Sequence, residues 1–209
     1  KDNLLEVDLS QWSGLTFNEV KTNFPEEYST WKKSPHELVI CRDDGSNYKP
    51  IEELLLQAEG FLKELLSVHT PNKNETVIVV AHNAILRCII LSLINNPSQG
   101  FRRIQLNNAS ISVLNLNQDQ NNSFKVQIES LNSTAHLKSS LPKKGDHARL
   151  ILVRHGETNW NKEGRFQGQI DIPLNENGIS QAQAAGKFLS EEQIDKAFSS
   201  SMSRPTQTA

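Results

Sequence analysis

Two histidines of the chain, His82 and His155, follow apolar runs that are rich in β-branched residues. Residues 77–81 lead directly into His82, and residues 150–153 lead into Arg154 and His155. Apolar runs without alternation predict strands buried on both faces of a parallel sheet. Ligands of open α/β sheets bind beyond the carboxyl ends of the strands. If the two runs form neighbouring strands, His82 and His155 face each other across one crevice, which is the setting of a binding or catalytic site.

The residues around His155 resemble a known signature. Residues 154–161 (RHGETNWN), supported by residues 165–168, 171–178 and 203–209, are similar to the motifs of the histidine phosphatase superfamily, which includes the phosphoglycerate mutases. The residues before position 132 resemble the later part of the same family. Residues 5–14 are similar to its acidic segment with the proton donor, and His82 stands where its second histidine is expected.

The resemblance implies a phosphoryl transfer through His155. A neutral imidazole can attack phosphorus and form a covalent intermediate, and Arg154 beside it favours an anionic substrate, because a guanidinium matches phosphate oxygens in pairs. By the resemblance, Arg154 and Arg204 hold two sides of the phosphoryl group. Asn161 and a protonated His82 complete the pocket, where His82 stabilises the charge on the transferred oxygens.

Glu6 is the candidate general acid for the leaving alcohol, and later the base that activates water. Gln167 is expected at the entrance of the pocket. The family usually has glycine after the second histidine, where a backbone N–H approaches phosphate closely. Here that residue is Asn83, which tolerates unusual backbone angles better than most residues and is counted among the phosphate-binding candidates.

Hydrolysis of a small phosphorylated metabolite is the predicted activity. Mutases of the family carry a longer insertion near the proton donor, and residues 5–14 are short by comparison. The alternatives are a mutase and a non-catalytic module that binds phosphorylated ligands, which Asn83 motivates. No metal and no cofactor are expected, because the arginines oppose a cation and no histidine pair has ligand spacing. Groups that select the substrate are expected in residues 33–50 and near residues 95–108.

The elements that must position these residues alternate between strands and helices. A capping box at residues 16–19 predicts a helix toward Trp31, interrupted at Pro25. Further helices are predicted over residues 51–66, 84–94 and 175–189, and another begins at residue 203. Strands are predicted over residues 76–81, 111–116, 124–131, 150–153 and 194–199. Residues 36–50 read as a loop. This order predicts a three-layer α/β/α fold with a mainly parallel central sheet, like the phosphoglycerate mutases.

The family order is permuted in this chain. Residues 1–131 correspond to the later part of a module, residues 132–148 read as a polar, lysine-rich linker, and residues 149–209 correspond to the earlier part. The two explanations are a piece of a tandem protein and a single permuted module. We favour the tandem origin, with the two pieces packed as one unit. The linker would also permit a homodimer that exchanges halves between chains.

Composition narrows the class of partner. The formal net charge is −2 over 209 residues, which provides no basic surface for nucleic acid and no electrostatic attraction to a membrane. The sequence contains no apolar stretch of membrane-spanning length. Two cysteines, Cys41 and Cys88, are too few for a disulfide framework and favour a reducing cytoplasm. A small phosphorylated substrate is the expected partner.

Overall fold

The computed structural model describes residues 2–42, 44–69, 75–96, 98–118, 124–137, 141 and 148–209. The chain divides into two compact units, Lys1–Lys138 and Ser139–Ala209. The boundary falls inside residues 132–148, the predicted linker. Most of that segment lies outside the described residues, but residues 132 and 133 belong to a strand. Each unit is described below by itself.

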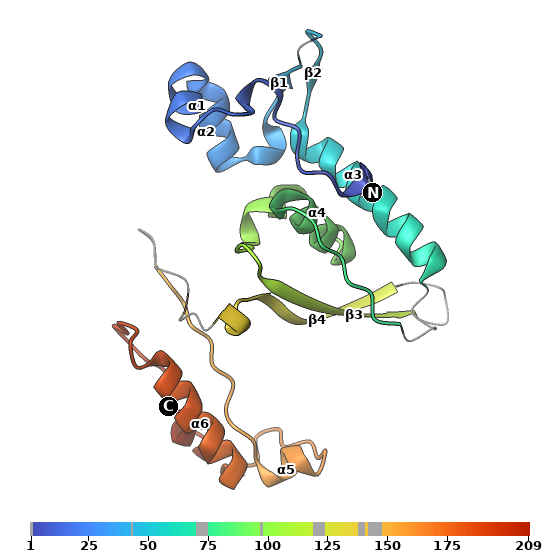
Figure 1. The fold of residues 1–209 in the computed structure, drawn as a ribbon. Coiled ribbons are helices and arrows are strands. Elements are labelled where there is room, and N and C mark those ends of the chain that lie inside the picture. Colours follow the sequence, from blue (N-terminus) through green and yellow to red (C-terminus); the bar gives the residue numbers. More distant parts are fainter. Residues whose placement is uncertain are drawn as a thin grey trace. The chain divides into compact units, whose positions relative to one another are not determined.

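In its described residues, the first unit contains four α-helices and two small antiparallel sheets of two strands each, which Figure 1 shows. The helices are α1 (Phe17–Asn23), α2 (Pro25–Lys33), α3 (Pro50–Val68) and α4 (Asn83–Leu93). The strands are β1 (Ile40–Cys41) with β2 (Asn47–Tyr48), and β3 (Ile111–Gln118) with β4 (Phe124–Ser133). The predicted helices are thus present, and the segment 36–50 read as a loop contains the short hairpin β1–β2.

Local sequence explains where the first two helices begin. The Thr16 hydroxyl accepts from the Glu19 backbone N–H, and the Glu19 carboxylate accepts from the Thr16 N–H, so the predicted capping box is present. Pro25 occupies the first turn of α2. A backbone N–H at that position has no acceptor within the helix, so proline loses no hydrogen bond there. The predicted interruption at Pro25 is therefore confirmed, and it separates α1 from α2.

The core of the first unit lies between α3 and α4. Ile51, Ile85 and Cys88 are completely buried there, and Phe101 packs with them at 2% exposure. Burying such a side chain contributes about 1.5–3 kcal/mol each. A second cluster forms around Trp12, and the partly buried Trp31 packs against both clusters. This packing holds the first turn of α4 in a defined place.

Three of the predicted strands have no ladder partner among the described residues. Residues 76–81, 150–153 and 194–199 carry no strand assignment, and Figure 1 draws the first two as irregular chain. Several of their apolar side chains face solvent, among them Ile78 at 83% and Leu152 at 84% exposure, whereas Val79 and Ala81 are partly buried against the core. A strand exists only through its neighbour's hydrogen bonds, so an apolar run predicts burial without supplying the partner. The described sheets are small and antiparallel, unlike the predicted parallel sheet.

The part of the second unit that the structure describes contains three α-helices. These are α5 (Asn159–Lys162), α6 (Glu176–Leu189) and α7 (Ser203–Thr208). The Asn175 side chain accepts from the Gly178 N–H and begins α6, as predicted. Among residues 148–209, Leu174 is the one buried apolar side chain of the core, whereas Leu150, Phe166 and Phe198 are exposed. The described part of this unit therefore lacks an apolar core of its own.

No helix within the described ranges combines the length and the apolar character needed to cross a membrane.

Candidate active site

His155 is held by a backbone carbonyl of the second unit. Its Nδ1 lies 2.7 Å from the Gly156 carbonyl oxygen. A carbonyl oxygen can only accept, so this bond requires a proton on Nδ1, and in the neutral imidazole it therefore leaves the lone pair on Nε2. The Gly156 N–H in turn donates to Thr208 Oγ1 at 3.2 Å, which connects this segment to α7. The imidazole is half-buried, and its role as a nucleophile stays a prediction.

Asn161 belongs to the tight turn that follows His155. Thr158 and Asn161 form a capping box at the start of α5, in which Asn161 Oδ1 accepts from the Thr158 N–H and hydroxyl, both at 3.1 Å. Thr158 is completely buried and bridges to Leu174. The Asn161 carbonyl oxygen is therefore used by the turn, and its side-chain NH₂ is the group that remains for a ligand.

The backbone after His155 packs tightly against α6. A Cβ built on Gly156 would lie 2.3 Å from the Gly178 carbonyl oxygen, so neither glycine has room for a side chain. Glu157 continues this contact, because its carboxylate accepts from the Asn175 amide at 2.8 Å. That bond, with one from Asn177, lowers the pKa of Glu157. Helix α6 therefore holds in place the backbone of Gly156, whose carbonyl oxygen bonds to His155.

Arg204 lies at the start of α7 and is buried at 8% exposure. Its two terminal nitrogens donate to the backbone carbonyls of Gly168 and Ile170, both at 3.0 Å. Arg204 Nε and Gln167 Oε1 are buried polar atoms with no hydrogen-bond partner among the described residues. Arg204 therefore positions the 168–170 segment, and the role of both side chains toward phosphate stays a prediction. Arg154 is exposed.

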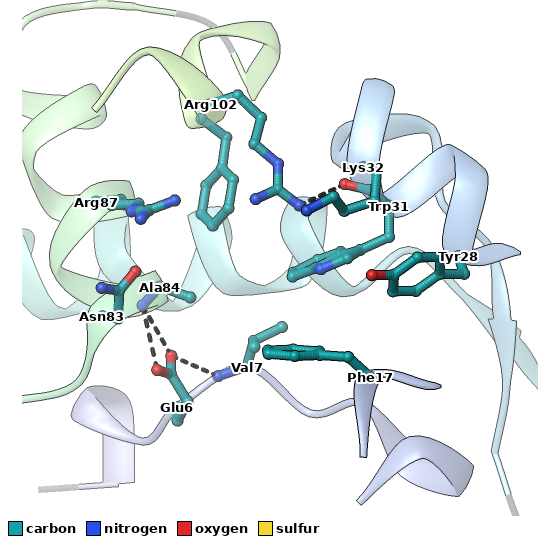
Figure 2. A pocket seen from close by; sticks show the side chains of 11 residues that line it. Glu6, Val7, Phe17, Tyr28, Trp31, Lys32, Asn83, Ala84, Arg87 and Arg102 are labelled. Atoms are coloured by element: carbon teal, nitrogen blue, oxygen red, sulfur yellow. Dashed lines mark hydrogen bonds between the residues drawn. The ribbon is translucent and has the colours of Figure 1, made fainter. Parts of the chain in front are cut away.

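Glu6 lies at the N-terminus of α4 in the first unit. Its carboxylate accepts from the Ala84 N–H at 3.0 and 3.2 Å and from the N–H of its neighbour Val7 at 2.9 Å (Figure 2). It also accepts from the Ile85 N–H at 3.3 Å. The first N–H groups of a helix have no partner within the helix, and its positive dipole end favours an anion. The protein thereby holds an otherwise exposed carboxylate in one place.

His82 and Asn83 flank the same helix start. His82 is the N-cap residue of α4 and does not cap it through its side chain. The Asn83 side chain donates to the Leu106 carbonyl at 2.7 Å, so its amide ties the helix start to the following loop. Both residues are exposed. The structure therefore brings Glu6, His82 and Asn83 together at one end of α4.

A pocket of about 280 Å³ opens beside Glu6. Figure 2 shows Arg87 and Arg102 along one part of it and Trp31 and Tyr28 along another. It is lined by Glu6, Val7, Phe17, Tyr28, Trp31, Lys32, Asn83, Ala84, Arg87, Phe101 and Arg102. Arg87 is not among the predicted site residues, although its place one helical turn after Asn83 could have indicated it. Arg102 lies within residues 95–108, where selecting groups were expected.

The predicted site residues thus occur in two groups. Glu6, His82 and Asn83 belong to the first unit; Arg154, His155, Asn161, Gln167 and Arg204 belong to the second. In the described part of the chain, no three histidine, cysteine or acidic side chains gather as a metal-binding group.

Comparison with known proteins identifies the family. The model of the histidine phosphatase superfamily (branch 1) matches residues 1–129 and 150–209. The chain belongs to this superfamily. Its fold is accordingly of the α/β class. YhfR of Bacillus stearothermophilus is similar in structure, with a TM-score of 0.53 and 19% identity over 66% of this chain and 62% of that one.

Two curated relatives extend the comparison. The chain is 29% identical to 2-carboxy-D-arabinitol-1-phosphatase of Triticum aestivum, over 99% of this chain and 41% of that protein. It is 28% identical to phosphoserine phosphatase 1 of Hydrogenobacter thermophilus, over 66% of this chain and 59% of that protein. A mycobacterial glucosyl-3-phosphoglycerate phosphatase bound to VO3 has a TM-score of 0.52 at 18% identity, over 64% of each chain. The chain spans about half the length of these curated relatives.

Proposed function

We propose that this protein hydrolyses a small phosphomonoester through a phosphohistidine at His155. The observation that carries the proposal is the bond from His155 Nδ1 to the Gly156 carbonyl, which leaves Nε2 free to attack. The relatives named above are phosphatases of small phosphorylated compounds, which supports the same reaction here. The short segment 5–14 favours water over a second alcohol as the final acceptor.

The reaction has two steps. His155 Nε2 forms a bond to phosphorus while the bond to the leaving alcohol oxygen breaks, and that oxygen takes a proton from Glu6. Water then attacks the phosphohistidine, Glu6 takes its proton, and phosphate leaves with His155 restored. In this proposal Arg154, Arg204 and His82 bind the phosphoryl oxygens, Asn161 and Asn83 add hydrogen bonds, and Gln167 lines the entrance. No metal or cofactor takes part in either step.

We further propose that residues 76–81 and 150–153 pair as parallel strands of a three-layer α/β/α domain. Two observations support the pairing. Both segments expose apolar side chains, and the described second unit lacks an apolar core, which a unit of this size needs for stability. Such a sheet brings His82 and His155 to one crevice.

We also propose that the permuted order arises because this chain is a piece of a tandem protein with two such modules. The wheat relative aligns with almost the whole chain in this order, over less than half of its own length, which supports a tandem origin. Within such a protein the strands pair in one chain, or between two chains that exchange halves in a homodimer. We also propose a reducing, cytoplasmic setting, which the free thiols of Cys41 and Cys88 support.

Hydrolysis of p-nitrophenyl phosphate tests the reaction. We expect His155→Ala to lower kcat by at least about a thousandfold, because the nucleophile is lost, while His136→Ala, an exposed histidine of the first unit, keeps full activity. Release of inorganic phosphate, rather than isomerisation of phosphoglycerate, separates hydrolase from mutase. Phosphate binding with no turnover by the unsubstituted protein would establish the non-catalytic module instead.

Glu6→Gln tests the proton donor separately, because glutamine can still accept from the α4 N–H groups. An alkyl alcohol is a poor leaving group and needs the proton, whereas p-nitrophenolate does not. We expect Glu6→Gln to slow phosphoserine hydrolysis far more than p-nitrophenyl phosphate hydrolysis. Equal losses on both substrates would remove Glu6 from this role.

A further inference from the structure

The pocket beside Glu6 places two guanidinium groups against aromatic rings. Arg87 of α4 lies with its Cζ 5.2 Å from the centre of the Phe101 ring. Arg102, at the end of the 3₁₀-helix Ser98–Arg103, lies with its Cζ 5.0 Å from the Trp31 ring and donates to the Trp31 carbonyl. These contacts fix both cations along the wall of a cavity that also contains Lys32. Positions of this kind favour an anionic ligand.

The charges of the wall are not balanced by the protein groups that line it. Lys32, Arg87 and Arg102 face Glu6, the single acidic residue of the lining. Burial, and then the nearby charge of Arg102, lower the pKa of Arg87, and burial lowers the pKa of Arg102 as well. Arg87 Nε is buried without a hydrogen-bond partner in the described ranges. An anion bound beside the guanidinium groups would offset the cost of burying their charges and of bringing them close together.

Glu6 connects this cationic pocket wall to the proposed hydrolysis. The proposed proton donor lines the same pocket, held at the first turn of α4, and Arg87 lies one turn further along that helix. The alcohol oxygen that Glu6 protonates must therefore be at the Glu6 end, and the rest of the alcohol extends into the pocket. A volume of about 280 Å³ lies just below the roughly 300–1,000 Å³ that is usual for ligand pockets, so the alcohol is small.

We propose that this pocket binds the alcohol part of the substrate, and that Arg87 and Arg102 bind a carboxylate on it. The inference rests on the proposed function, since it assigns the pocket to the leaving group of that reaction. The carboxylate is favoured over a second phosphate because it is the smaller anion, and the cavity of about 280 Å³ is small for a ligand pocket. Each guanidinium presents its N–H groups as a planar fork that matches the two oxygens of a carboxylate.

Binding measurements with a matched pair of ligands test the proposal. 3-Phosphoglycerate and glycerol 3-phosphate differ in having a carboxylate or a hydroxymethyl group at the same carbon. By isothermal titration of the His155→Ala protein, which does not turn them over, we expect 3-phosphoglycerate to bind about tenfold to a hundredfold more tightly, as charge-assisted hydrogen bonds allow. Equal affinities, or no binding of 3-phosphoglycerate, would overturn the proposal.

Substitutions assign the preference to the two arginines. Arg102→Gln and Arg87→Gln, each in the His155→Ala background, should bring the affinity ratio close to one and leave the affinity for glycerol 3-phosphate nearly unchanged. Arg103→Gln is the control, since Arg103 is the neighbouring arginine and does not line the pocket. A ratio that survives Arg102→Gln contradicts the assignment even if Arg87→Gln fails to fold. Tighter, arginine-dependent binding of propane-1,3-diol bisphosphate would replace the carboxylate by a phosphate.

The two proposals fail in different ways. Turnover of p-nitrophenyl phosphate by the unsubstituted protein, without any preference for 3-phosphoglycerate, leaves the phosphatase and removes the carboxylate pocket. An arginine-dependent preference without turnover keeps the pocket and removes the phosphatase reaction.

Discussion

Two glycines of the same helix provide a sharp test of how α6 supports His155. A Cβ on Gly178 would lie 2.1 Å from the Glu157 carbonyl oxygen and 2.8 Å from its backbone nitrogen, whereas a Cβ on Gly186 would meet nothing within 4 Å. Both obstacles at Gly178 are backbone atoms, which cannot rotate away as a side chain does. Gly178→Ala must therefore push residues 156–157 away from the helix.

The two substitutions should change local stability in opposite directions. Gly186→Ala removes a flexible residue from a helix interior and should stabilise α6 by about 0.5–1 kcal/mol. Gly178→Ala gains the same propensity but overpacks a backbone contact, which typically costs about 1–3 kcal/mol. The displaced Gly156 carbonyl is the acceptor of His155 Nδ1, so activity should fall with stability in Gly178→Ala alone.

Hydrogen exchange of the α6 amides, followed by mass spectrometry, measures this difference within the full chain. Each 1.4 kcal/mol corresponds to about a tenfold change in the opening equilibrium, so the α6 peptides should exchange faster in Gly178→Ala and more slowly in Gly186→Ala. Phosphatase activity is measured on the same samples. If both variants protect α6 equally and keep full activity, the close packing of α6 against residues 156–157 is wrong.

Two further predictions concern a buried thiol and a surface carboxylate. Burial raises the pKa of the Cys88 thiol to about 12, so alkylation of the native protein should modify the partly exposed Cys41 first; equal labelling of the two peptides by mass spectrometry would contradict this. The Asp171 carboxylate accepts from the Ser203 N–H and hydroxyl, both at 2.7 Å, which lowers its pKa below the ordinary 3.8. Its stabilising contribution is therefore present above pH 3.8 and lost as the pH falls through the lowered value. Asp171→Asn should flatten the acid limb of a stability–pH curve, and an unchanged limb would show that Asp171 contributes nothing.

The helices were predictable because their signals are local. The capping box at Thr16, the proline that starts α2 and the Asn175 cap each act within about one helical turn, and each is present in the structure. The strands at 111–116 and 124–131 were also predicted from local patterns, and the structure pairs them as β3 and β4. Residues 76–81 have an equally strong apolar pattern, but their hydrogen bonds need a partner from a distant part of a chain.

The site residues likewise divide into those that the sequence identifies and those whose contacts only the tertiary structure shows. The sequence by itself determined the family and the nucleophile candidate, because residues 154–161 are contiguous and their types identify the signature. Tertiary structure decided what contacts these side chains: Glu6 caps α4 across 78 residues, and Arg102 donates to Trp31 across 71. It also showed that Arg204 uses two of its nitrogens on the backbone of residues 168–170. Contacts between distant segments depend on how the core between α3 and α4 packs, and no local pattern of residues encodes that packing.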